Sequence, residues 1–168
     1  MNVSELNRRI VKENLSINVE GAVALREAGI EKARAMGISG FLTIVNDTGM
    51  EQASQVVGLT ANPLTVEIAR AKIKTVLAVH RSTSLQRRRM IEMGQSIDLF
   101  AGQLGTLFSG GVAAFADEAL TQFVGAMAFS GATQEQDEEI CRTAIERIGL
   151  YTDLPKYPEQ PAEQTSTK

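Results

Sequence analysis

The sequence predicts an α+β domain in which helices cover an antiparallel sheet. The run Phe41–Val45 is β-branched and aromatic, and it ends at the turn sequence Asn46-Asp47-Thr48-Gly49 before Ser54–Val57 returns, which predicts a hairpin. Residues 123–129 are apolar on both sides, as expected for a central strand that is covered on both faces. The order helix, helix, hairpin, long helix, short helix, strands, helix then fits an antiparallel sheet with helical layers.

Two helices are predicted before the hairpin. The first covers residues 4–15 and has apolar residues on one face. Asn18 or Ser16 can cap the second, which runs to about Met36 and stops at Gly37.

Two more helices are predicted after the hairpin. Asn62-Pro63 begins the first with a proline in its opening turn, and apolar residues follow at helical spacing up to His80, which we expect to end the buried stripe. Thr83 can cap the second, over 85–93. A glycine-punctuated stretch follows, in which a short strand is expected near 106–108.

The last strand turns into a helix with a defined start. Thr133 and Gln136 have the spacing of a capping box. Cys141 belongs to the apolar stripe of this helix, whereas Glu138 and Arg142 are expected on its outer side. Residues 1–150 are therefore predicted to form one domain. Residues 151–168 hold three of the four prolines and no apolar period, which predicts an extended or disordered tail.

Composition argues against several classes of partner. The net charge of −3 gives no overall basic field, so no nucleic-acid role is expected. The single cysteine cannot form an internal disulfide and suits a reducing compartment. The N-terminus lacks the apolar core of a secretory signal, and no run approaches the roughly 18 apolar residues of a membrane span. We therefore expect a cytoplasmic protein without membrane contact.

Three stretches carry a family resemblance over roughly residues 15–149. Ser109-Gly110-Gly111 followed by VGAMAFSGATQEQDEEI resembles the closing segment of the GlcG/HbpS-like family, also known through the C-terminal domain of the PduO corrinoid enzymes. TIVNDTG resembles the family's strand ending in Val-Val-Asp-x-Gly. The family's central-helix pattern of Lys, Thr and then Arg-x-Thr-Ser falls on Lys72, Thr75, Arg81, Thr83 and Ser84.

The resemblance implies a more specific fold and a ligand. It implies a profilin-like five-stranded antiparallel sheet with helices on both faces. It also implies assembly, since family members commonly form dimers and higher rings, with Gly110-Gly111 near a shared pocket. Haem is the ligand that it most readily implies.

His80 and Arg81 are the first candidate site residues. The unperturbed pKa of a histidine lies near neutrality, so His80 could act as an acid, a base or an axial iron ligand. The alternative is a partly buried histidine at a helix end that bonds a free carbonyl. Arg81 offers a bidentate fork for a carboxylate or propionate, and a pair with Asp47 would use it equally well.

The other candidates are a carboxylate and a glycine turn. Asp47 ends a strand and could be a general base, although such residues more often cap their own turn. Ser109, Gly110 and Gly111 could offer backbone N–H groups to an anionic ligand, and a tight turn would explain the glycines as well. No Cys or His spacing predicts a metal site.

A run of three arginines, Arg87, Arg88 and Arg89, also attracts anions in principle. Consecutive helix positions point in different directions, so we interpret the run as a solvated surface.

These features favour a small-molecule or tetrapyrrole-binding protein, with haem as its possible cofactor. Arg81, His80, Ser109, Gly110 and Gly111 are the predicted ligand-binding residues. The alternative is a cofactor-independent lyase, isomerase or hydrolase in which Asp47 or His80 moves a proton; whether the protein is an enzyme stays open. Gly21 and Gly29 in one helix, the doubly apolar strand and Gly110-Gly111 together predict a homo-oligomer, at least a dimer, with the pocket near the subunit contact.

Overall fold

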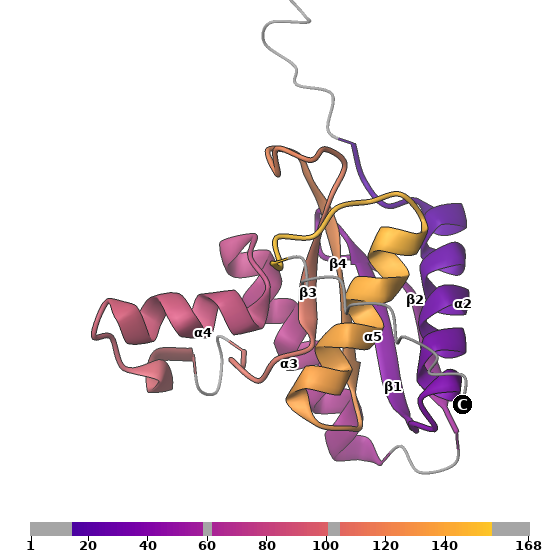
Figure 1. Cartoon of the computed structure of the whole chain (residues 1–168), viewed down its shortest axis with the longest axis horizontal. Coiled ribbons are helices and arrows are strands. Elements are labelled where there is room, and N and C mark those ends of the chain that lie inside the picture. The colour runs from indigo at the N-terminus through magenta and orange to yellow at the C-terminus, as the bar shows by residue number, and fades with distance from the viewer. Residues whose placement is uncertain (1–14, 59–61, 101–104, 156–168) are drawn as a thin grey trace, which may run out of the picture.

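Four strands form one antiparallel sheet in the order β2-β1-β4-β3. The architecture is that of a computed structural model, which describes residues 15–58, 62–100 and 105–155 (Figure 1). The central strands are β1 (Gly40–Asn46) and β4 (Phe123–Ser130), and the edge strands are β2 (Glu51–Val57) and β3 (Gly111–Phe115). The predicted α+β class is confirmed, but the described residues form four strands and not the expected five.

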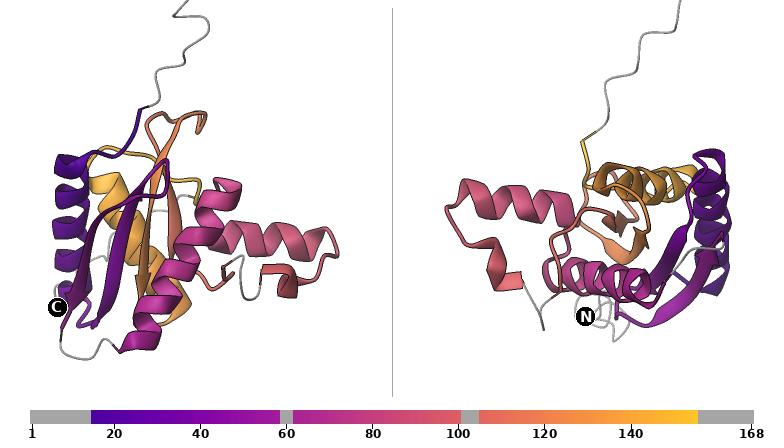
Figure 2. Two further views of the ribbon diagram at one scale, coloured as in Figure 1. Left: turned by 180° about the vertical axis from the view of Figure 1, so that it is seen from behind. Right: turned by 90° about the horizontal axis from the view of Figure 1, so that it is seen from below.

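Helices cover both faces of this sheet. Helices α2 (Val19–Ala35) and α5 (Gln134–Arg147) lie on one face and α3 (Pro63–Val79) lies on the other (Figure 2). The α4 helix (Thr83–Glu92) and the short 3-10 helix η1 (Ile97–Phe100) project sideways from the body beside α3 and β3 (Figure 1). None of the helices that the structure describes has the length and apolar character needed to cross a membrane.

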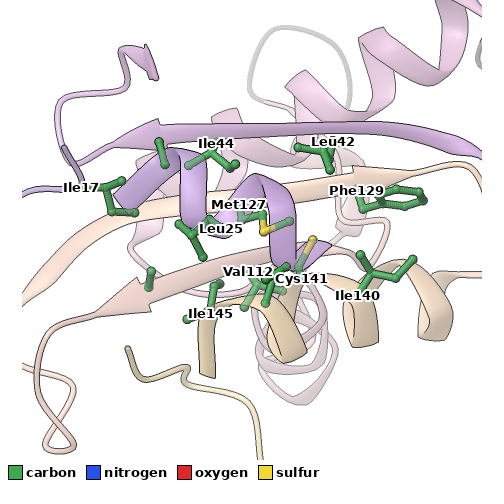
Figure 3. Close-up of a cluster of buried hydrophobic side chains, with 14 of the residues drawn as sticks. Ile17, Leu25, Leu42, Ile44, Val112, Met127, Phe129, Ile140, Cys141 and Ile145 are labelled. Carbon is green, nitrogen blue, oxygen red and sulfur yellow. The ribbon is translucent and has the colours of Figure 1, made fainter. Parts of the chain in front are cut away.

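The two helical layers enclose separate apolar cores. The larger core lies between the sheet, α2 and α5 (Figure 3) and includes Leu25, Leu42, Met127, Phe129 and Ile145. The smaller core lies between the sheet and α3 and includes Val45, Ile73, Val76, Ala126 and Ala128. Successive residues of β4 thus enter opposite cores, which is why both faces of this strand are apolar in the sequence.

Three of the predicted helix starts are confirmed. The cap predicted at Thr83 is wrong, because α4 begins at Thr83 itself after Ser82, without a side-chain cap bond, and Thr83 Oγ1 contacts Gly111 instead. The side chains of Asn18 and Asn62 accept hydrogen bonds from Gly21 N (2.9 Å) and Thr65 N (3.0 Å) at the starts of α2 and α3. Thr133 and Gln136 form both halves of the capping box at the start of α5. Each cap satisfies a backbone N–H group that has no partner within its own helix.

The outer edge of β3 is closed by side chains, which explains the missing fifth strand. Thr83 Oγ1 accepts from Gly111 N (3.2 Å) and lies 3.3 Å from Gly111 O, and Ser82 Oγ accepts from Ala113 N (3.1 Å). Phe115 exchanges both backbone hydrogen bonds with Tyr151, each 2.9 Å long. The outward-facing N–H groups of Gly111, Ala113 and Phe115 are therefore occupied without another full strand.

The expected strand near 106–108 is wrong. Thr106 N donates to Thr75 Oγ1 (3.0 Å), and Thr75 Oγ1 donates to Thr106 O (2.8 Å). This exchange with a helix side chain replaces the pairing that a strand would need. Gly105 permits the approach, since its φ is +119° and a Cβ there would lie 2.4 Å from Thr75 Oγ1.

The body of the domain extends beyond residue 150. Tyr151 pairs with Phe115, Leu154 is buried, and Asp153 accepts hydrogen bonds from Ser82 N (2.9 Å) and Ser82 Oγ. The predicted start of the tail at residue 151 is therefore too early. The rest of that tail, the helix predicted over 4–15 up to residue 14, and residues 59–61 and 101–104 lie outside the described residues.

Arg142 departs from its expected position on α5. It is buried, and its Nη1 donates to Pro155 O (3.3 Å), so it holds the segment after the helix instead of facing solvent. Burial also raises the pKa of Glu138 above its ordinary value, although Ser84 and Arg142 act to lower it. The side of α5 that the sequence pattern assigns to solvent is thus partly an interior surface.

Candidate functional site

His80 occupies the C-terminal cap of α3 and is exposed, so the expectation that it ends a buried stripe is wrong. Its backbone is left-handed, with φ 47° and ψ 45°, and its N–H donates to Val76 O (2.7 Å). The imidazole stacks on the ring of Phe123, with 4.1 Å between centroids and 8° between planes. The ring is therefore held by stacking on one face, although the residue as a whole is exposed.

Phe123 also contacts a further ring, that of Phe115. We use the term aromatic row for the four residues His80, Phe123, Phe115 and Tyr151. Phe115 meets Phe123 edge to face at 5.9 Å between centroids. Phe115 and Tyr151 are paired across adjacent strands, which places their side chains on the same face. Phe115 is buried, whereas His80 is exposed and Tyr151 is 40% exposed, so both ends of the row reach the surface.

Arg81 follows His80 directly and points towards α4. Its Nη1 donates to Gln86 Oε1 (2.7 Å), and its charge acts on nearby Asp153. A guanidinium has five N–H donors, so this single contact leaves others for a second acceptor. The alternative pair with Asp47 is not formed.

Asp47 lies at the same end of the sheet as His80 but has a different partner. Its carboxylate accepts from Ser16 Oγ. The turn that contains it is built by Asn46, whose Oδ1 accepts from Thr48 N (3.1 Å) and Met50 N (2.8 Å). Gly49 has φ +85°, and a Cβ there would meet Leu77 at 2.9 Å, so the turn packs on α3 one helical turn before His80.

The predicted glycine site lies at the opposite end of β3. Gly111 is paired with Ala128, whereas His80 stacks on Phe123, five residues away along β4, which is roughly 17 Å in a strand. Gly111 N is already used by Thr83, and Ser109 N donates to Gln134 Oε1 (3.0 Å). The structure therefore does not bring His80 together with Ser109, Gly110 and Gly111, and the enzyme alternative loses the amides that it needs beside His80. Arg81 lies two residues before Thr83, whose side chain contacts Gly111.

A buried ion pair explains the glycines. Lys72 is only 1% exposed, and its Nζ donates to Asp137 Oδ2 (2.7 Å) and Phe129 O (2.7 Å). Gly110 lies against this pair, because a Cβ there would meet Asp137 Cβ at 2.5 Å and Lys72 Nζ at 2.9 Å. Burial raises the pKa of Asp137, although Lys72 acts to lower it.

Cys141 packs against the glycine turn from the side of α5. It is fully buried, burial raises the pKa of its thiol well above the ordinary value, and Sγ lies 3.5 Å from Gly110 O. A buried thiol with a raised pKa is a poor nucleophile. This agrees with the structural role expected from its place on the apolar stripe.

A pocket of about 240 Å³ opens between α4, η1 and the segment before β3. Sequence reasoning missed this pocket, because it depends on the path of residues 105–108. Its lining consists of Arg87, Ile97, Asp98, Gly105, Thr106, Leu107 and Phe108.

A second pocket, of about 280 Å³, lies at the start of α2. Its lining is mostly apolar and includes Ile17, Val124, Ile148 and Leu150. Within the described segments, no group of three or more His, Cys, Asp or Glu side chains could hold a metal ion.

Comparison with known proteins places these features in a wider context. A family model described as haem-degrading protein, HbpS-like, matches residues 17–146. The structure is similar to that of a PduOC–haem complex, with a TM-score of 0.71 and 23% identity over 82% of this chain and 99% of that chain. No curated protein matches the sequence.

Two further solved structures are similar. One is a double mutant of HbpS from Streptomyces reticuli, with a TM-score of 0.70 and 20% identity over 83% of this chain and 92% of that chain. The other is protein ORFY from Klebsiella pneumoniae, with a TM-score of 0.69 and 22% identity over 87% of this chain and 94% of that chain. At these identities the likeness establishes the fold.

Proposed function

Because the chain belongs to the HbpS-like family of haem-degrading proteins, we propose that it binds haem at the end of α3, with His80 as the iron ligand. The observation that carries this proposal is the exposed imidazole of His80, the single histidine of the sequence, which stands at the head of the aromatic row. A neutral imidazole nitrogen is a common axial ligand of haem iron. When bound, haem supplies an iron centre that changes oxidation state and takes a further ligand.

The surroundings of His80 fit a tetrapyrrole. Phe123 fixes the imidazole plane by stacking, and Tyr151 presents an exposed ring in the same row. These rings offer an apolar surface for a porphyrin face. Arg81 lies one residue beyond the ligand, and its N–H groups beyond the one bonded to Gln86 can donate to a propionate.

Hemin titration of the purified protein tests this proposal. We expect a saturable Soret shift in the wild type, at least about tenfold weaker binding in His80→Ala, and a smaller loss in Arg81→Ala. Arg89→Ala, on the exposed surface of α4, is the control for a change in net charge. Absence of a saturable shift in the wild type would overturn haem binding. Equal affinity of wild type and His80→Ala would overturn only the choice of iron ligand.

We also propose that the chain forms a homo-oligomer, at least a dimer, although for a different reason from the sequence argument. Gly29 faces Met127 and Gly110 faces the Lys72–Asp137 pair, so the glycines serve contacts inside the domain. The projecting α4 helix and its C-terminal cap instead expose large apolar side chains to solvent, namely Ile91 and Met93. A second copy packed on this part would remove them from water.

A further inference from the structure

The 240 Å³ pocket between α4 and η1 contains a cation, Arg87, for which the described residues provide no hydrogen-bond or ion-pair partner. Arg87 is half-buried, and no hydrogen bond or ion pair joins it to another residue in the described part of the chain. Arg88 and Arg89, its neighbours on α4, are exposed and do not line the pocket. The expectation that the whole arginine run is a solvated surface is therefore wrong for Arg87.

The carboxylate in the pocket wall does not satisfy Arg87. Asp98 Oδ2 accepts from Ser96 Oγ (3.3 Å), and Ser96 Oγ also accepts from Asp98 N (3.2 Å), which together form a local turn. A partly desolvated guanidinium gains most from an acceptor that matches its fork of N–H groups. A carboxylate entering the pocket would supply this acceptor.

Most of the remaining lining is apolar, and hydrogen bonds hold part of it in place. Ile97 and Phe108 are 42% and 53% exposed, so they present apolar surface, and Leu107 is buried behind them. The two hydrogen bonds between Thr106 and Thr75 fix the wall that carries Leu107 and Phe108. The volume lies below the roughly 300–1,000 Å³ of pockets for drug-sized ligands, which limits the occupant to a small molecule.

We infer that this pocket binds a small carboxylate with an apolar body, whose charged end pairs with Arg87 and whose body packs on Ile97, Leu107 and Phe108. The site is separate from the one proposed for haem, because no member of the aromatic row lines the pocket. The two sites nevertheless share helix α3. Thr106, in the pocket lining, contacts Thr75, and Thr75 lies five residues before His80, which corresponds to roughly 7.5 Å along the helix. Phenylacetate is a suitable test compound, and phenylacetamide is its uncharged counterpart of nearly the same shape.

Calorimetric titration of the full chain with both compounds tests the inference. We expect phenylacetate to bind about 10- to 100-fold more tightly than phenylacetamide, because only the former makes charge-assisted hydrogen bonds. Arg87→Ala should abolish this preference, Arg87→Lys should keep part of it, and Phe108→Ala should weaken both compounds together. Arg89→Ala removes the same charge from the same helix and should leave the preference unchanged.

The outcomes separate this site from the proposed haem site. His80→Ala should bind phenylacetate like the wild type, so a failure of hemin binding leaves the result for the pocket intact. No binding of phenylacetate, equal binding of the two compounds, or equal losses in Arg87→Ala and Arg89→Ala would overturn the inference. Circular dichroism of each variant shows whether a loss reflects unfolding, and Arg87→Lys provides a second test should Arg87→Ala fail to fold.

Discussion

Lys72 forms the buried ion pair with Asp137 against which the glycine turn packs. Asp137→Ala would leave its ammonium buried with only Phe129 O as a partner, and we expect a loss of roughly 3–5 kcal/mol in the free energy of unfolding. The double variant Lys72→Met with Asp137→Leu should lose less than Asp137→Ala, because no charge then stays buried. Urea unfolding measures both. A loss below about 1 kcal/mol in Asp137→Ala would show that the pair is not buried as described.

Asp153 predicts a pH dependence with a definite sign. Burial raises the pKa of Asp153 above its ordinary value of 3.8, although Ser82 and Arg81 act to lower it. Between the unfolded and the raised native pKa, the native state binds more protons, so the contribution of this group to the free energy of unfolding falls as the pH rises.

Asp153→Asn removes that contribution. Between about pH 4 and pH 7, the free energy of unfolding of the wild type should therefore fall relative to that of Asp153→Asn. Urea titrations at three pH values measure the difference. The Asn substitution also weakens the contact with Ser82, but this effect is similar at every pH and shifts the curves without changing their relative slope. Parallel curves would contradict the raised pKa.

Single residues differ in how well the sequence predicts them. Asn18, Asn62 and Thr133 act on the next few residues of the chain, so local patterns identify them as caps. Lys72 pairs with a residue 65 positions away, and a lysine in an amphipathic helix is ordinarily solvated. Its match to the family pattern was the signal that marked it, without showing what it contacts.

Among the elements, β3 depends most on side chains of another element. Thr83→Val keeps the shape of the side chain but removes both contacts with Gly111, and we expect a loss of about 1–3 kcal/mol in the free energy of unfolding. Faster amide hydrogen exchange at Gly111 should accompany this loss. Thr48→Val, in the exposed hairpin turn, is the control; it removes a solvent-exposed hydrogen bond from Thr48 Oγ1 to Asn46 Oδ1 (2.8 Å), which water can replace, and should change stability by about 0.5 kcal/mol. Unchanged exchange at Gly111 would contradict the role of Thr83.

Element prediction succeeded where the partner is near in sequence. The hairpin of β1 and β2 needs only the turn at 46–49, and it is confirmed. The strand expected at 106–108 failed because Thr75, 31 residues earlier, takes the backbone groups of Thr106. The separation of His80 from Gly110-Gly111 could likewise not be predicted from the sequence, because it depends on the register between β3 and β4.

For the whole molecule, the projecting α4 region makes assembly testable. Ile91→Glu with Met93→Glu places two charges on apolar side chains that are 59% and 56% exposed. We expect an assembled wild type and a shift of this variant towards the monomer mass of 18.1 kDa, measured by light scattering coupled to gel filtration. Leu64→Glu alters a side chain that is 66% exposed at the start of α3 and should leave the mass unchanged. A wild type of 18.1 kDa at micromolar concentration would contradict assembly.

For the whole molecule, the sequence predicted the class of fold, but not the direction of α4 or the packing of the segment after α5. A strand that is apolar on both sides and helices with apolar stripes require a sheet covered on both faces, so two helical layers follow from them. The sideways path of α4 and the packing of residues 151–155 on β3 depend on Ser82, Thr83 and Asp153, which no periodic pattern distinguishes from ordinary polar surface residues.

The occupied outer edge of β3 also restricts how the protein can polymerise. A filament built by sheet extension needs two different open edges in each copy, so that one molecule adds to the next without limit. In this chain Thr83, Ser82 and Tyr151 accept from the outward amides of Gly111, Ala113 and Phe115, respectively, and β2 is the other edge of the sheet. Within the described sheet, two copies could join only through β2 against β2, a self-complementary contact that closes after one pairing. Linear fibre growth by addition of strands to this sheet therefore lacks a second open edge.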